Sequence, residues 1–118
     1  MILVDTSVWI DHFRNDNAEL RKLLNNNEVM THPFIIGELA CGLIQNRSEI
    51  LNLLAELPAV ITADHQEVLK LIESKKLYGS GIGLIDAHLI ASALITKVGI
   101  FTLDKPLAKA TSYLGINQ

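Results

Sequence analysis

The sequence contains a single cysteine, Cys41, in 118 residues. One thiol excludes an internal disulfide and is typical of proteins of the reducing cytoplasm, and we expect Cys41 to be buried and inert. No apolar run approaches the roughly 18 residues that a membrane helix needs. Only three apolar residues separate Met1 from Asp5, so we expect no signal peptide at this end. We therefore expect a cytoplasmic protein that makes no membrane contact.

Basic residues are not in excess either, because 13 acids outnumber 10 bases and give a net charge of −3. A general DNA-binding protein should be basic, so contact with DNA would have to come through a partner protein. A cation bound by four of the acids would neutralise them and leave the remainder slightly basic. A nucleic-acid substrate is therefore compatible with this composition.

Apolar residues are abundant, at 49% of the chain and with a mean hydropathy of +0.30. A small monomer does not easily bury so much apolar surface, so we expect a subunit interface and a homo-oligomer. No repeat, low-complexity segment or linker interrupts the sequence. A length of 118 residues then indicates one domain, residues 1–118.

Short apolar runs alternate with amphipathic runs along the chain, which indicates an α/β domain with a parallel sheet. We expect Thr6 or Ser7 to cap the first helix, Ser48 to cap the fourth and Asp64 to cap the fifth. The apolar runs predict strands at 2–4, 28–31, 59–62 and 98–103, with a stub at 116–118. The periodicity predicts helices over 8–14, 18–24, 34–44, 48–57, 84–97 and 105–113, and another after Asp64.

Two aspartates come directly after predicted strands. Asp5 follows Ile2-Leu3-Val4, and Asp104 follows Ile100-Phe101-Thr102-Leu103. The carboxyl ends of parallel strands meet at one edge of a sheet, where α/β proteins bind their ligands. Each aspartate is also a candidate N-cap of the next helix, and for Asp104 capping and function compete closely.

Two more acids, Glu38 and Asp86, interrupt helical segments that are otherwise apolar. A carboxylate in such surroundings is costly unless it is paired, capped or bound to a metal. Asp86 falls in the first turn of its helix, where the dipole favours an anion. For Glu38 the alternative is an ordinary solvent-facing helix residue, but its neighbours Phe34 and Gly42 do not form a polar face.

Four carboxylates in one crevice repel one another strongly unless a cation is bound. A site of oxygen ligands selects Mg²⁺ or Mn²⁺ rather than zinc. Such ions activate water and stabilise the leaving oxygen of a phosphodiester. We therefore predict a metal-dependent hydrolase in which Asp5 and Asp86 hold the principal ion and Glu38 and Asp104 assist.

Four sequence segments together resemble the PIN domain, and within it the VapC-type ribonuclease toxins of toxin–antitoxin pairs. They are Met1-Ile2-Leu3-Val4-Asp5-Thr6-Ser7-Val8-Trp9-Ile10, Gly37-Glu38-Leu39, Asp86-Ala87-His88-Leu89-Ile90-Ala91 and Thr102-Leu103-Asp104. The resemblance implies a three-layer α/β/α sandwich whose central parallel sheet has four to five short strands. It places the family's acidic quartet at Asp5, Glu38, Asp86 and Asp104, with a nearby hydroxyl from Thr6 or Thr102.

The resemblance also implies Mg²⁺- or Mn²⁺-dependent cleavage of RNA, a homodimer, and a cognate DNA-binding antitoxin that blocks the site. If water is the nucleophile, the products should carry a 5′-phosphate and a 3′-hydroxyl. Lys75 and Lys76 are either a solvated helix end or phosphate contacts, and the first interpretation is slightly favoured. Lys105, Lys109 and Arg14 are the other candidates for contact with the RNA backbone.

Other functions fit the sequence less well. A phosphatase of the haloacid-dehalogenase type needs a second aspartate where this chain has Ser7, and a receiver domain needs an acidic pair after the first strand. A PIN-like module kept only for binding is a non-enzymatic alternative, and the presence of all four acids argues against it.

His88 lies two residues from Asp86 and points away from it on a helix, so it is expected in the core or an interface.

Overall fold

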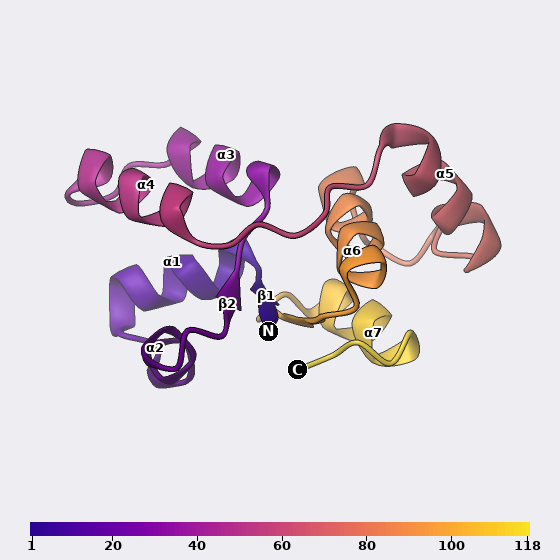
Figure 1. The fold of residues 1–118 in the computed structure, drawn as a ribbon. Helices are drawn as coiled ribbons and strands as arrows, with labels where there is room; N and C mark the ends of the chain where they lie inside the picture. Colours follow the sequence, from indigo (N-terminus) through magenta and orange to yellow (C-terminus); the bar gives the residue numbers. More distant parts are fainter.

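The computed structural model describes all 118 residues and is organised around the central strand β1 (Ile2–Val4). β1 pairs in parallel with β2 (Val29–Met30) on one side and with β3 (Gly99–Phe101) on the other, in the order β2-β1-β3. Strands pair with both edges of β1 and helices lie on both sides of the sheet (Figure 1), so Leu3 and Val4 are completely buried. The end of β1 therefore lies in the middle of the carboxyl edge of the sheet.

The prediction of four to five strands was too high, because the sheet has three. The other two segments are reduced to single parallel bridges, Thr31 with Ala59 and Ile100 with Asn117. The first exchanges only the hydrogen bonds Thr31 N to Pro58 O and Val60 N to Thr31 O. Pairing this short does not make a strand, although both segments extend the sheet at its edges.

Seven helices surround the sheet, which is the middle layer of an α/β/α arrangement. Helices α1–α4 lie on one side of the strands and α5–α7 lie on the other (Figure 1). Helices α6 and α7 both contact β3. The predicted helices all exist, with ends shifted by a few residues. Their bounds are α1 Thr6–Asn15, α2 Ala18–Asn25, α3 Pro33–Cys41, α4 Arg47–Glu56, α5 His65–Ser74, α6 Leu84–Thr96 and α7 Lys105–Tyr113.

The core is continuous from the sheet into the helices, and α6 is its most buried helix. Every residue from Ala87 to Ala93 is buried, as expected for a helix that is apolar on nearly all sides. Trp9 is also in the core, at 4% exposure. Helices α3–α4 and α5 lie far out on opposite sides (Figure 1), and the molecule is 40 Å long but only 24 and 23 Å across.

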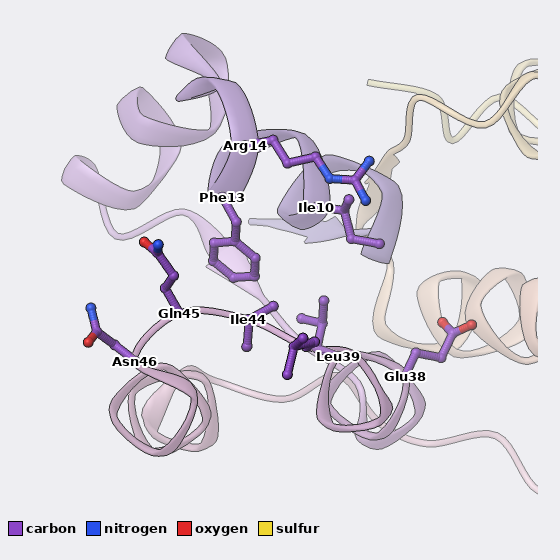
Figure 2. Close-up of a pocket in the computed structure, with 10 residues that line it drawn as sticks. Ile10, Phe13, Arg14, Glu38, Leu39, Ile44, Gln45 and Asn46 are labelled. Carbon is purple, nitrogen blue, oxygen red and sulfur yellow. The ribbon is translucent and has the colours of Figure 1, made fainter.

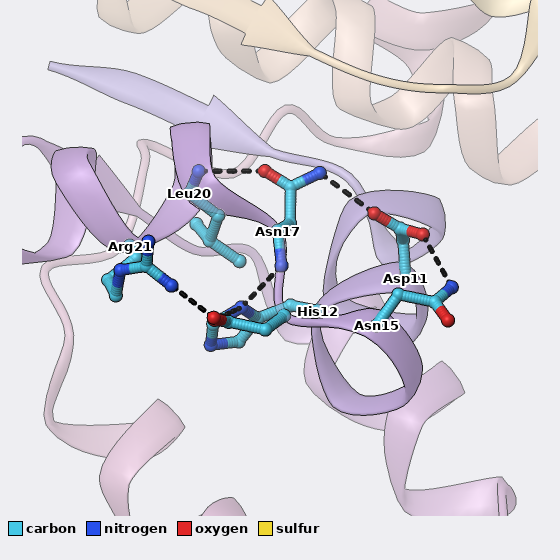
Figure 3. A network of polar contacts seen from close by, with 7 residues as sticks. Asp11, His12, Asn15, Asn17, Leu20 and Arg21 are labelled. Atoms are coloured by element: carbon cyan, nitrogen blue, oxygen red, sulfur yellow. Dashed lines mark hydrogen bonds and ion pairs between the residues drawn. The ribbon is translucent and has the colours of Figure 1, made fainter.

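A polar network holds the corner between α1 and α2 (Figure 3). The Asn17 side chain accepts from Leu20 N at 2.9 Å and donates to Asp11 at 2.9 Å, and Asn15 also donates to Asp11 at 3.1 Å. These hydrogen bonds lower the pKa of Asp11. Arg21 pairs with Asp16 across the same turn. Asp11 and Asp16 are thus structural acids of this corner.

Three local predictions were wrong. The residue preceding α1 is Asp5, whose side chain makes no capping bond, and Thr6 and Ser7 are already helical. Asn46 in a left-handed conformation, not Ser48, precedes α4. Cys41 is exposed because it is the last residue of α3 rather than part of a longer helix. The predicted cap at Asp64 is confirmed, as a reciprocal capping box with Glu67.

The helices are also too short or too polar to cross a bilayer: none qualifies as a membrane span.

Candidate functional site

The four predicted acids come from four elements and meet at the carboxyl edge of the sheet. Asp5 follows β1, Asp104 precedes α7, Asp86 is in the first turn of α6 and Glu38 is in α3. The pKa of Asp86 is raised, first by burial and then by the negative charges of Asp5, Asp104 and Glu38, while a hydrogen bond from Gly83 N lowers it. The fold therefore brings the quartet close enough for each charge to act on Asp86.

Asp5 is the most buried member, at 6% exposure, and two hydroxyls hold it. Ser7 Oγ and Thr102 Oγ1 each donate to Asp5 Oδ2 at 2.7 Å. The same hydroxyl oxygens accept backbone N–H groups, Ser7 from Leu103 and Thr102 from Asp104, both at 3.0 Å. This network joins the end of β1 to the segment between β3 and α7, and so orients Asp5 and Asp104 together.

A third hydroxyl ties α1 to α3. Thr6 Oγ1 donates to Glu38 Oε1 at 2.7 Å, although Glu38 is exposed. Sequence reasoning anticipated Thr6 and Thr102 as hydroxyls of the site but treated Ser7 only as a helix cap. The spacing of Asp5 and Ser7 could have predicted this role of Ser7, because a side chain two residues beyond Asp5 can turn back toward the Asp5 carboxylate.

Asp86 and Asp104 also make local bonds at helix starts. Asp104 Oδ2 accepts from Leu107 N at 3.1 Å, so the capping alternative for Asp104 is correct. Asp86 Oδ2 accepts from Gly83 N at 3.1 Å. Capping and function do not exclude each other here, because each bond uses one carboxylate oxygen and holds the side chain at the sheet edge.

Every member of the quartet keeps one oxygen without a hydrogen bond from the protein. The bonded oxygens are Oδ2 of Asp5, Asp86 and Asp104 and Oε1 of Glu38. Carboxylate oxygens are the donors that Mg²⁺ and Mn²⁺ prefer, so the donor chemistry fits these ions. No group of three acidic, histidine or cysteine side chains is arranged closely enough in this structure to hold a metal ion. Gathering several ligands on an ion would thus require side-chain rotation.

A cavity of about 410 Å³ opens beside Glu38, between α1 and the segment α3–α4 (Figure 2). Ile10, Phe13 and Arg14 line one wall from α1, and Leu39 and Ile44 lie opposite. Figure 2 shows the Glu38 carboxylate at one end of the cavity and Gln45 and Asn46 at the other. The cavity thus joins an apolar surface to one acid of the quartet.

Directly before α3 lies a buried histidine that was not predicted to be functional. His32 is completely buried, and its Nδ1 accepts from Phe34 N at 3.0 Å, which caps the helix that carries Glu38. Burial, and then the charge of His88, lower the pKa of His32 to about 4. His88 is buried at 7% exposure, as predicted for a core histidine. The signal for this cap was the His32-Pro33 pair before an apolar helix.

An α/β/α fold with four acids at the carboxyl edge of its sheet is the arrangement that the sequence resemblance implied. The sequence pattern of the PIN domain family matches residues 2–112, and the chain belongs to this family. It is also 44% identical over 117 residues to two proteins named Ribonuclease VapC32, from Mycobacterium tuberculosis strains CDC 1551 / Oshkosh and ATCC 25618 / H37Rv. These matches cover 98% of this chain and 94% of each relative.

Among solved structures, the crystal structure of PAE2754 from Pyrobaculum aerophilum superposes with a TM-score of 0.61. The superposition covers 92% of this chain and 77% of that one, at 18% sequence identity. At this identity the likeness concerns the fold alone. It supports the parallel sheet and its helical layers, and says nothing of the site.

Proposed function

We propose that this protein is a metal-dependent endoribonuclease and the toxin of a toxin–antitoxin pair. The observation that carries the proposal is the position of Asp5, Glu38 and Asp104 around Asp86, close enough for their negative charges to raise its pKa. The relatives named Ribonuclease VapC32 supply the substrate class, RNA. Unpaired carboxylates that repel one another are stable together when a cation neutralises them.

Asp5 and Asp86 are the proposed principal ligands, and Glu38 and Asp104 assist directly or through water. A bound Mg²⁺ or Mn²⁺ would supply Lewis-acid activation of water and neutralisation of the phosphate charge. Ser7 and Thr102 donate hydrogen bonds to the Asp5 carboxylate and so orient it. Thr6 does the same for Glu38, whose second oxygen is left to orient water. We expect in-line attack by water, with 5′-phosphate and 3′-hydroxyl products.

Purified protein incubated with a structured RNA mixture, with and without Mg²⁺ or Mn²⁺, tests the proposal. Cleavage should need the metal and should be lost in Asp86→Asn, whereas the control Glu56→Gln, an exposed acid at the end of α4, should cleave normally. A 2′,3′-cyclic phosphate on the products would contradict attack by water. Absence of cleavage by folded protein, together with absence of a metal-induced thermal shift, would favour a PIN-like module kept for binding.

We also propose that a segment of the antitoxin occupies the cavity beside Glu38. Leu43 at its edge is fully exposed, at 102%, and Phe13 and Ile44 provide apolar walls. A segment bound there would end next to Glu38 and could block the quartet. Leu43→Glu should weaken binding of the antitoxin without unfolding the toxin, because Leu43 has no packing to lose. Unchanged affinity would place the partner elsewhere.

Self-association is the third part of the proposal. Leu69 on α5 and Ile95 on α6 are exposed apolar residues, at 44% and 37%, and α5 and α6 pack against each other. These exposed residues account for part of the apolar excess of the sequence. Light scattering should give a dimer for the wild type and a monomer for Leu69→Glu/Ile95→Glu, and a monomeric wild type would overturn this part.

A further inference from the structure

Charge is distributed unevenly along the chain, in a way that its net value hides. Residues 1–74 contain 11 acids and five bases, whereas residues 75–118 contain five lysines and only two acids. Those two acids are Asp86 and Asp104, both members of the quartet. Apart from these two acids, every charged residue of 75–118 is therefore a lysine.

The fold gathers three of these lysines around one cavity of about 360 Å³. Lys75 and Lys76 reach it from the end of α5, and Lys109 reaches it from α7, with Ser80 and Tyr113 also on its wall. No carboxylate lines this cavity, and none of the three lysines takes part in an ion pair. Ammonium groups that share a concave surface without counter-charges produce a positive potential suited to a polyanion. We call this cavity the lysine pocket.

The lysine pocket and the candidate site share the helix α7. Asp104 is the N-cap of this helix. Lys105, Lys109 and Tyr113 follow at intervals of four residues, which places them on one face. The helix from Asp104 to Tyr113 is about 13 Å long, so the stripe begins at the quartet and ends at the wall of the pocket, where Tyr113 lies.

The opposite wall of the pocket also leads to the quartet. It is the loop between Lys76 and Gly83, and Gly83 N donates to Asp86 Oδ2 at 3.1 Å. In this loop, a Cβ on Gly81 would lie 3.5 Å from Pro106 Cβ, so the loop contacts the first turn of α7. Both walls of the lysine pocket thus end at a site acid.

We propose that the lysine pocket binds the RNA chain on one side of the phosphate that is cleaved. Lys75, Lys76 and Lys109 contact neighbouring phosphates, and Tyr113, which is 72% exposed, stacks on a base. The inference rests on the proposed ribonuclease function and adds the path of the substrate. It also explains how an acidic site attracts a polyanion, because the adjacent cations offset the repulsion by the quartet.

RNA is the occupant that these residues favour over an acidic protein segment. The pocket lies along the helix that begins at Asp104, one acid of the site proposed to act on phosphodiesters, and it combines lysines with an exposed aromatic ring. Stacking on that ring is tolerant of sequence, because every base has a π-face. The pocket should therefore determine how much single-stranded RNA must flank the cleavage point, rather than which bases are read.

The test compares Lys75→Gln/Lys109→Gln with the control Lys22→Gln/Lys97→Gln. Both variants remove two exposed charges, but Lys22 lies on α2 and Lys97 just before β3, near the opposite edge of the sheet. A fluorescent single-stranded RNA is titrated at several salt concentrations, by anisotropy in an Asp86→Asn background. The pocket variant should bind at least tenfold more weakly, with a salt slope smaller by about 1.4. The control should bind like its parent.

Cleavage kinetics separate binding from chemistry. In the active background, the pocket variant should raise KM about tenfold and leave kcat within twofold of the wild type. Tyr113→Ala should raise KM as well, and Tyr113→Phe should restore it because the ring still stacks. A KM and salt slope equal to those of the control, in an enzyme that cleaves RNA, would overturn the proposal.

Two further outcomes distinguish this inference from the proposed function. If the wild type cleaves no RNA with any metal but the pocket variant still loses RNA affinity, the nuclease proposal fails and the pocket assignment stands. If the pocket variant binds RNA normally and loses only its antitoxin, the pocket is a protein-binding surface and the assignment is wrong.

Discussion

The Thr102 hydroxyl donates a 2.7 Å hydrogen bond to Asp5 Oδ2 across 97 positions of sequence. It joins the ends of two neighbouring parallel strands, because Thr102 follows β3 and Asp5 follows β1. The same oxygen accepts from Asp104 N at 3.0 Å. One small side chain thus aligns two of the four acids, although it is not itself a proposed ligand.

Thr102→Val should separate positioning from folding. The substitution keeps the shape of the side chain but removes both hydrogen bonds, so we expect activity to fall about 10- to 100-fold, as for other groups that orient metal ligands. Thr102→Ser keeps the hydroxyl and should retain most activity. The measurement is cleavage rate against Mg²⁺ concentration, in which the valine variant should need more metal. Equal metal dependence in all three proteins would show that the network does not orient a ligand.

Asp86→Asn should remove metal-dependent cleavage and yet stabilise the metal-free protein. The pKa of Asp86 is raised in the fold, so its charge opposes folding above that pKa, and the penalty disappears as pH falls and the group protonates. Relief of about 1 kcal/mol would raise the Tm of a domain of this size by roughly 4 °C. The Tm gain, measured without metal at pH 7, should shrink in acid.

Asp11→Asn is the matched control for this prediction. Hydrogen bonds from Asn15 and Asn17 lower the pKa of Asp11, so its charge is favoured by the fold and its neutralisation should give no gain in Tm. Added Mg²⁺ should raise the Tm of the wild type and of Asp11→Asn, but not that of Asp86→Asn. An equal thermal shift in all three proteins would place the ion away from Asp86.

His32 should make stability depend on pH on the acid side. Its pKa is lowered from 6.5 to about 4 by burial and the charge of His88. The stabilisation is complete above pH 6.5 and is lost as pH falls from 6.5 to about 4, because the unfolded chain binds the proton first. The loss is on the order of 3 kcal/mol at most.

Urea denaturation of wild type and His32→Asn between pH 4.5 and 8 measures this effect. Asparagine can still accept from Phe34 N and cap α3, but it does not titrate. The variant should therefore be less dependent on pH, whatever its absolute stability. Curves that stay parallel over the whole range would show that His32 is not the group responsible.

Gly81→Ala should destabilise the loop between α5 and α6 by about 1 kcal/mol or more, because Gly81 has a φ of +90°. Gly83→Ala is its control, since Gly83 has open space around its Cβ position and a φ of −92°. The control should cost less than Gly81→Ala, because alanine adopts this φ without strain and its smaller entropy loss on folding offsets its weaker preference at an N-cap. Urea midpoints that change equally would contradict this assignment of strain.

Helices and the inner strands were predictable because their signals are local. The largely apolar segment around Asp86 indicated a buried helix, and the structure buries every residue from Ala87 to Ala93. The outer strands were overestimated for the same reason. The β-branched residues of 59–62 favour extended backbone, whereas 116–118 contains only one apolar residue, Ile116. A strand also needs a long partner, and each segment makes only one bridge.

The four acids could be selected from the sequence because each departs from its local pattern, either at a strand end or inside an apolar helix. The resemblance placed Thr6 or Thr102 near these acids, but the acid that each hydroxyl binds could not be predicted. Ser7 and Thr102 bind Asp5 because β1 and β3 are neighbours, and nothing in either segment specifies its neighbour. The same holds for His32, whose burial depends on packing against other elements.

By itself, the sequence determined the α/β alternation, the domain and the acids at the sheet edge, since backbone preference and side-chain periodicity act over a few residues. Only the tertiary structure decided that the hydroxyls face those acids and that Lys75, Lys76 and Lys109 share one cavity. Strand order and helix packing bring distant residues together to bury apolar surface. The positions of exposed side chains then follow from that packing, not from their neighbours in sequence.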